Sequence, residues 1–98
     1  MDLIKHIVCF RLRDNSRESC EKARDILMSM KGNVPSLLEI EVGIDFLHSS
    51  RSYDVILQVL LQSREDLEIY QNDSYHCSVV KPYMHSVRTD SVAVDYEI

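Results

Sequence analysis

The sequence predicts an α+β fold, a ferredoxin-like sandwich in which a four-stranded antiparallel sheet carries helices on one face. The main observation is the order of the segments, which reads strand, helix, strand, strand, helical pair, strand. The chain has 98 residues and is 45% hydrophobic, which is enough for one hydrophobic core but not for two. With 2 glycines and 2 prolines, it contains no stretch typical of a linker. We therefore expect a single domain over residues 1–98 with βαββαβ topology.

The first three elements follow from the spacing of apolar residues. Residues 3–13 alternate in the manner of a strand, and His6 falls in the more apolar of the two rows. Residues 15–31 have helical spacing, start with residues that cap helices, and stop before Gly32. Residues 37–46 alternate between apolar and mostly polar positions, which indicates a strand with one buried face. The expected inner row is Leu38, Ile40, Val42, Ile44 and Phe46.

The second half of the chain continues the pattern. Residues 53–62 form a third strand whose two faces are both partly apolar. Ser63 is placed to cap a short helix that an Asn-Asp-Ser break ends. Residues 75–87 are helical in spacing, although Pro82 must kink or end that helix. Residues 90–98 alternate again and close the sheet.

Composition and charge exclude several classes of protein. The formal net charge is -5, from 16 acidic and 11 basic residues, so we expect no nucleic-acid partner. No apolar run reaches membrane-spanning length and no signal peptide is predicted, so we expect no membrane partner. The 3 cysteines lack C-x-x-C spacing, which favours a reducing, cytoplasmic location.

No metal site or cofactor is expected. Histidines and carboxylates do not recur at metal-ligand spacing, and Glu39 with Glu41 reads as the solvated face of a strand. His48 and His85 lie among polar residues and are expected to be solvated. The opposite sheet face has apolar residues that no helix covers, which predicts a homodimer packed sheet to sheet. These residues are Ile7, Cys9, Ile56 and Leu60.

Five segments together resemble the stress-responsive A/B barrel (Dabb) family over essentially the whole chain. They are "IKHIVCFRLR" at the start, "EVGIDF", "SYDVILQV", "YQNDSYH" and the closing "VAVDYEI". Their order and spacing carry the resemblance, because each segment alone is short and mostly hydrophobic. The resemblance implies a ferredoxin-like monomer whose sheet pairs with that of a second copy to form an α/β barrel.

The resemblance also implies a site between the sheet and the helices. The family includes a plant cyclase that folds a linear tetraketide into olivetolic acid without a cofactor. By motif, its general-base histidine falls on His76, its aspartate on Asp95, its assisting tyrosine on Tyr70 and its N-terminal histidine on His6. We therefore expect His76, Tyr70 and Asp95 as catalytic residues, with Asp95 holding His76. The expected ligand-binding residues are His6, Met28, Val59 and Ala93.

Two departures from the cyclase pattern leave the function open between two alternatives. Asp73-Ser74 stands where the family has His-Pro, and Met28 stands where the cyclase has a second pocket tyrosine. The interpretation we prefer is a homodimeric module that binds a small carbonyl or aromatic compound without turnover. The alternative is a cofactor-independent acid-base enzyme, such as an aldol cyclase or dehydratase, with His76 as general base. A His76–Asp95 pair that is purely structural also fits the sequence.

Overall fold

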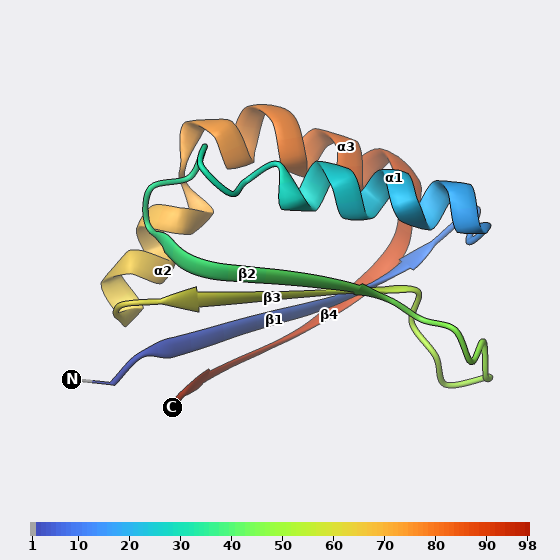
Figure 1. Ribbon diagram of the computed structural model, residues 1–98, viewed down its shortest axis with the longest axis horizontal. Helices are drawn as coiled ribbons and strands as arrows, with labels where there is room; N and C mark the ends of the chain where they lie inside the picture. Colours follow the sequence, from blue (N-terminus) through green and yellow to red (C-terminus); the bar gives the residue numbers. More distant parts are fainter. Residues whose placement is uncertain (1) are drawn as a thin grey trace.

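The computed structural model describes residues 2–98 and confirms the ferredoxin-like prediction. The four strands form one sheet in the order β2-β3-β1-β4, with every neighbouring pair antiparallel. The helical segments lie on one side of that sheet, and the two ends of the chain lie near one another (Figure 1). The elements are β1 (Ile4–Leu12), α1 (Arg17–Met28), β2 (Leu37–Ile44), β3 (Val55–Leu61), α2 (Arg64–Gln71), the π-helical turn η1 (His76–Val80), α3 (Lys81–Val87) and β4 (Arg88–Glu97).

Serine side chains start the first two helices, as the sequence predicts. The hydroxyl of Ser16 accepts a hydrogen bond from the backbone N–H of Ser19 at 3.3 Å. At the start of α2, the hydroxyl of Ser63 accepts one from the backbone N–H of Asp66 at 3.2 Å. Each bond satisfies one N–H group that has no partner inside the helix. The regular part of α1 ends at Met28, slightly before the predicted end, and turns lead on to Gly32 at φ 85°.

Pro82 produces a π-helical turn rather than a simple break. Proline has no N–H group, and its ring would clash with the carbonyl four residues earlier in a regular α-helix. The chain widens just before this point, so that the N–H of Lys81 donates to the carbonyl of His76. Regular α-helix then resumes as α3. The wide turn places the buried His76 at the start of the helical segment formed by η1 and α3.

The predicted inner row of the second strand is correct only in its middle. A register shift between Leu37 and Glu39 breaks the alternation of β2, and Leu38 is exposed. Such a bulge adds one residue to one strand, so a side chain moves to the other face. The strand ends at Ile44, and Phe46, predicted to be buried, is 88% exposed.

The helices cover the two halves of the sheet differently. The helix α1 packs directly on β2 and β3, whereas η1 and α3 make sparse contacts with the strands beneath them. Side chains between α1 and the sheet are fully buried, as at Leu27, Met30, Val59 and Leu61. In Figure 1, α1 and α3 both lie above the sheet. Among residues 2–98, no helix is long and apolar enough to cross a membrane.

The other face of the sheet has no cover in the single chain. On β4 it carries Val92, Val94 and Tyr96, all exposed. They lie across from Cys9, Ile7 and Lys5 of β1, respectively. We call this surface of the sheet the outer face.

Candidate functional site

A cavity of about 230 Å³ lies between the sheet and the segment formed by η1 and α3. Its floor includes His6, Val8 and Phe10 of β1. β4 contributes Arg88 at its start and then only Ser91 and Ala93, and the cavity is open there because these two small side chains leave the helical layer unsupported. The cavity therefore results from the sparse packing of η1 and α3 on this half of the sheet.

His6 and Asp95 form a histidine–carboxylate pair at one end of this cavity. The two residues are direct partners in the β1–β4 register, and Nδ1 of His6 hydrogen-bonds to Oδ1 of Asp95. His6 is only 5% exposed, whereas the Asp95 side chain is 41% exposed. A carboxylate can only accept, so Nδ1 carries the proton and Nε2 of the neutral ring keeps its lone pair.

His76 has a different partner from the one that the sequence predicts. Its Nδ1 donates to the backbone carbonyl of Tyr70 at 3.0 Å, so the predicted His76–Asp95 contact is wrong: Asp95 pairs with His6 instead. The register explains this, because Asp95 is directly opposite His6 in the sheet. Burial, together with the nearby Lys81 ammonium, lowers the pKa of His76 below its ordinary value. The ring is therefore neutral at neutral pH.

Both histidines keep one ring nitrogen free. Neither His6 nor His76 uses its Nε2 atom in a hydrogen bond within residues 2–98. In the same part of the chain, Ser36 Oγ is the one fully enclosed side-chain N or O atom without a partner. The two Nε2 atoms are therefore not sealed in the core. Because both side chains line the cavity, each can present a lone pair to a ligand there.

Tyr70 separates the two imidazoles but directs its hydroxyl elsewhere. Its ring centroid is 5.5 Å from that of His6 and 4.5 Å from that of His76. The hydroxyl donates to the sulfur of Met30 at 3.7 Å inside the core. Burial also raises the pKa of this phenol. The ring thus lines the cavity, but the hydroxyl does not point at a ligand as a catalytic donor would.

The other predicted ligand-binding residues divide between cavity and core. Ala93 lines the cavity beside the open edge. Val59 is fully buried beneath α1, and Met28, at the end of that helix, does not line the cavity. The sequence interpretation also missed a basic group at the cavity, which consists of Lys81 and His85 of α3 and Arg88 at the start of β4. Their spacing of four and three residues would have placed them on one helical face.

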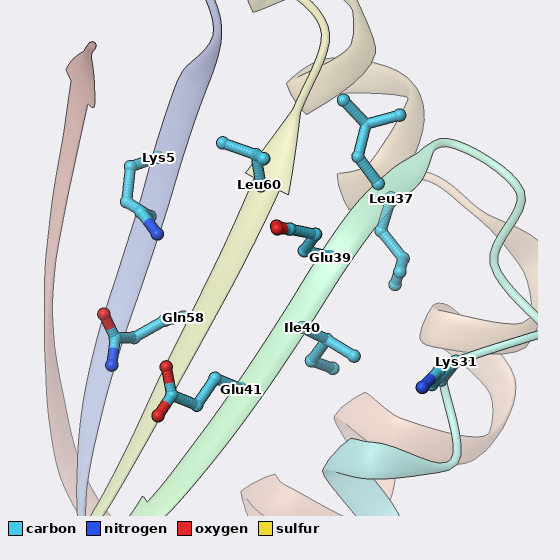
Figure 2. Close-up of a pocket in the computed structure, with 9 residues that line it drawn as sticks. Lys5, Lys31, Leu37, Glu39, Ile40, Glu41, Gln58 and Leu60 are labelled. Atoms are coloured by element: carbon cyan, nitrogen blue, oxygen red, sulfur yellow. The ribbon is translucent and has the colours of Figure 1, made fainter.

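A larger hollow of about 480 Å³ on the outer side of β2 and β3 is a weaker candidate. Figure 2 shows Lys5, Gln58, Glu39 and Glu41 across three neighbouring strands. It contains no histidine or cysteine, and its charges of both signs compensate one another. No group of three or more histidine, cysteine or acidic side chains that could hold a metal ion occurs within residues 2–98.

Comparisons with known proteins agree with this fold. A dimeric ferredoxin-like protein of unknown function from Thermobifida fusca is 22% identical, with 99% of this chain and 92% of that chain covered and a TM-score of 0.83. A hydroxynitrile lyase from Passiflora edulis is 15% identical, with 99% and 94% covered and a TM-score of 0.82. A Dabb family protein from Mesorhizobium loti is 17% identical, with 98% and 96% covered and a TM-score of 0.75.

No curated protein matches the chain. The family comparison does give a result, and it covers nearly all of the sequence. The description of the stress-responsive A/B barrel domain matches residues 4–98, from the first residue of β1 to the end of the chain. This chain therefore belongs to the stress-responsive A/B barrel domain (Dabb) family.

Proposed function

We propose that the cavity binds a small carbonyl compound and that His6 removes a proton from the carbon next to the carbonyl, without a cofactor. The observation that supports this most is the His6–Asp95 pair, in which a carboxylate fixes the ring and leaves Nε2 free. This differs from the sequence interpretation, which gave the role of base to His76. His76 lacks a carboxylate partner on its ring, and its lowered pKa makes it a weaker base.

The proposed step needs three contributions from the chain. Nε2 of His6 takes the proton, and the Asp95 carboxylate stabilises the imidazolium that forms. The C–H electron pair moves onto the carbonyl oxygen as an enolate, and the ammonium of Lys81 lines the same cavity and favours this negative charge. The neutral His76 accepts a hydrogen bond at Nε2 and orients a ligand hydroxyl. Return of the proton from His6 completes the exchange.

Proton exchange tests this proposal directly. The wild-type protein is expected to accelerate deuterium incorporation into the methyl group of acetophenone in D₂O, followed by NMR. His6→Gln is expected to reduce this rate by about 100-fold or more, and Asp95→Asn by about tenfold, as for loss of a general base and of its orienting partner. His48→Gln, which changes an exposed histidine in a turn, is the matched control. Exchange by His6→Gln at the wild-type rate would rule out His6 as the base.

Binding without turnover is a second candidate, and one observation favours it. The Tyr70 hydroxyl bonds to Met30 in the core, so the cavity has no phenol to stabilise an enolate. On this alternative, acetophenone perturbs the NMR signals of cavity residues in wild type, and far less in His76→Ala. Exchange then stays at the rate of the buffer alone. Accelerated exchange that depends on His6 would exclude this alternative.

We also propose that the protein is a homodimer through the outer face, in the reducing cytoplasm that the sequence suggests. The relative from Thermobifida fusca is dimeric, and the exposed apolar side chains of β4 need a partner of this kind. Light scattering is expected to give twice the monomer mass for wild type. Val94→Glu, at a residue that is 61% exposed in one chain, is expected to give the monomer mass. Ile69→Glu on α2 serves as control, and a monomeric wild type would contradict the proposal.

A further inference from the structure

The face of α3 that borders the cavity is basic. Lys81 and His85 are one turn apart on α3, and Arg88 follows directly after this helix as the first residue of β4. Each of them lines the cavity. No aspartate or glutamate does so, although acidic residues outnumber basic ones 16 to 11 in the chain. The charge of the cavity is thus opposite to that of the protein as a whole.

These basic groups have no acidic partner within residues 2–98. Lys81 Nζ donates to the backbone carbonyl of Gln71 at 2.6 Å, which leaves its charge uncompensated. The side chains of His85 and Arg88 form no ion pair in this part of the chain. Arg13 adds a further positive charge, because its guanidinium donates to the carbonyl of Arg88 at 3.2 Å. The cationic side chains of Lys81, Arg88 and Arg13 are together suited to bind an anion.

Arg88 and the histidine pair mark opposite ends of the cavity. His6 is paired with Asp95 near the start of β1, whereas Arg88 is paired with Leu12 at its end. The seven residues of α3 span about 10 Å from Lys81 to the start of β4 at Arg88. The proton-transfer end and the Arg88 end are therefore far enough apart to hold two different groups of one ligand.

We propose that the ligand is an oxo-carboxylate, a small molecule that places its carbonyl group beside His6 and His76 and its carboxylate at Arg88 and His85. The position of the carbonyl group rests on the proposed function, and the carboxylate is what this inference adds. The planar guanidinium of Arg88 can bind both carboxylate oxygens at once, which a lysine cannot do. The cavity of about 230 Å³ has room for a monocyclic aromatic acid.

Two probes that differ in charge test this ligand class. Para-acetylbenzoate carries a ketone and a carboxylate across one ring, and para-acetylbenzamide replaces only the carboxylate with a neutral amide. By NMR titration, wild type is expected to bind the acid about tenfold more tightly than the amide. Arg88→Gln is expected to remove most of this preference without weakening amide binding. Arg88→Lys is expected to restore only part of it, because it returns the charge without the planar fork.

Lys22→Gln, which removes an exposed positive charge from α1, is the matched control and is expected to keep the full preference. Equal affinity for the acid and the amide in wild type, or a preference that survives in Arg88→Gln, would overturn the inference. Neither result bears on acetophenone exchange, which involves no carboxylate. Conversely, a preference for the acid that depends on Arg88 supports the inference even if acetophenone is not exchanged. In that case the proposed proton transfer to His6 is wrong, whereas the proposed binding of a carboxylate at Arg88 is supported.

Discussion

The two halves of the helix-covered sheet face belong to one sheet, yet one is a closed core and the other a cavity. Under α1, aliphatic side chains such as Val59 and Leu61 are completely buried. Under η1 and α3, the outermost strand offers only the small side chains of Ser91 and Ala93 beyond Arg88 at its start, and the helical segment makes few contacts with the strands. We call these the closed half and the cavity half.

The difference shows how little is needed to open a site in a small domain. Close packing removes all space when facing side chains match in volume. Two small residues at an edge strand, together with a helix widened before Pro82, are enough to leave room for a ligand. The polar groups that line this room come from positions that would otherwise belong to the core, as the buried His6 and His76 show.

Leu61→Ala should cause the largest loss of stability, because it makes a void in the closed half. Leu61 is fully buried and pairs across the sheet with Ile4 and Leu37. Truncation of such a leucine costs about 2–5 kcal/mol of unfolding free energy. Urea denaturation measures the change, and Ile69→Ala, at an exposed site on α2, is expected to cost well under about 1 kcal/mol. A loss at Leu61 as small as that of the control would show that this half is loosely packed.

His76→Gln should have an intermediate effect that depends on pH. At about pH 8 the substitution should lower the free energy of unfolding by about 1 kcal/mol, because the ring donates a buried hydrogen bond to the backbone carbonyl of Tyr70. Burial lowers the pKa of His76 in the folded chain, whereas the unfolded chain titrates near about 6.5. Below that pH the unfolded wild type gains a proton that the folded protein resists, so wild-type stability falls. Glutamine does not titrate, so the difference in unfolding free energy between wild type and His76→Gln should become smaller as the pH falls to about 5.

Urea denaturation at several pH values measures this narrowing, and His85→Gln, at an exposed histidine, is its control. A difference between wild type and His76→Gln that stayed constant from about pH 8 to about pH 5 would contradict a lowered pKa. One that grew in acid would show the opposite sign, namely that the folded state stabilises the charged ring.

The sequence predicted the closed half better than the cavity half. Alternation and helical spacing identify the strands and the face of α1, because these periods follow directly from backbone geometry. The same reasoning failed at Leu38, where a bulge reverses the alternation, and at Phe46, which lies beyond the end of β2. A bulge of one residue depends on how two strands pair, so it cannot be predicted from the sequence of one strand alone.

At the candidate site, three of the expected residues line one cavity, but the pairing of Asp95 differs from the prediction. His6, Tyr70 and His76 do surround one cavity, as the family resemblance suggests. The partner of Asp95 depends on the β1–β4 register, and the direction of the Tyr70 hydroxyl depends on the position of Met30. Both are long-range relations that neither spacing nor motif specifies. The helical spacing of the basic residues on α3 was readable, but a cavity beneath them was not.

Tyr70→Phe should have a small effect, because it removes only the hydroxyl group. That hydroxyl donates to a methionine sulfur, which is a weak acceptor, so we expect a loss of less than about 1 kcal/mol. Acetophenone exchange should fall far less than in His6→Gln. Urea denaturation and NMR exchange are the two measurements. A loss of exchange as large as that in His6→Gln would return Tyr70 to the role of donor that the sequence interpretation gave it.

Ala93→Leu should change stability least and ligand binding most. The added atoms enter space that is empty at the open edge of the cavity half, so no packed side chain has to move. The free energy of unfolding should stay within about 0.5 kcal/mol of wild type, as at surface sites. The side chain would then occupy the room that a ligand needs, and NMR titration should show no binding of para-acetylbenzoate. Val92→Leu, on the outer face beside it, should keep binding intact. A strongly destabilised Ala93→Leu would mean that this half is packed like the other, and the division between core and cavity would fail.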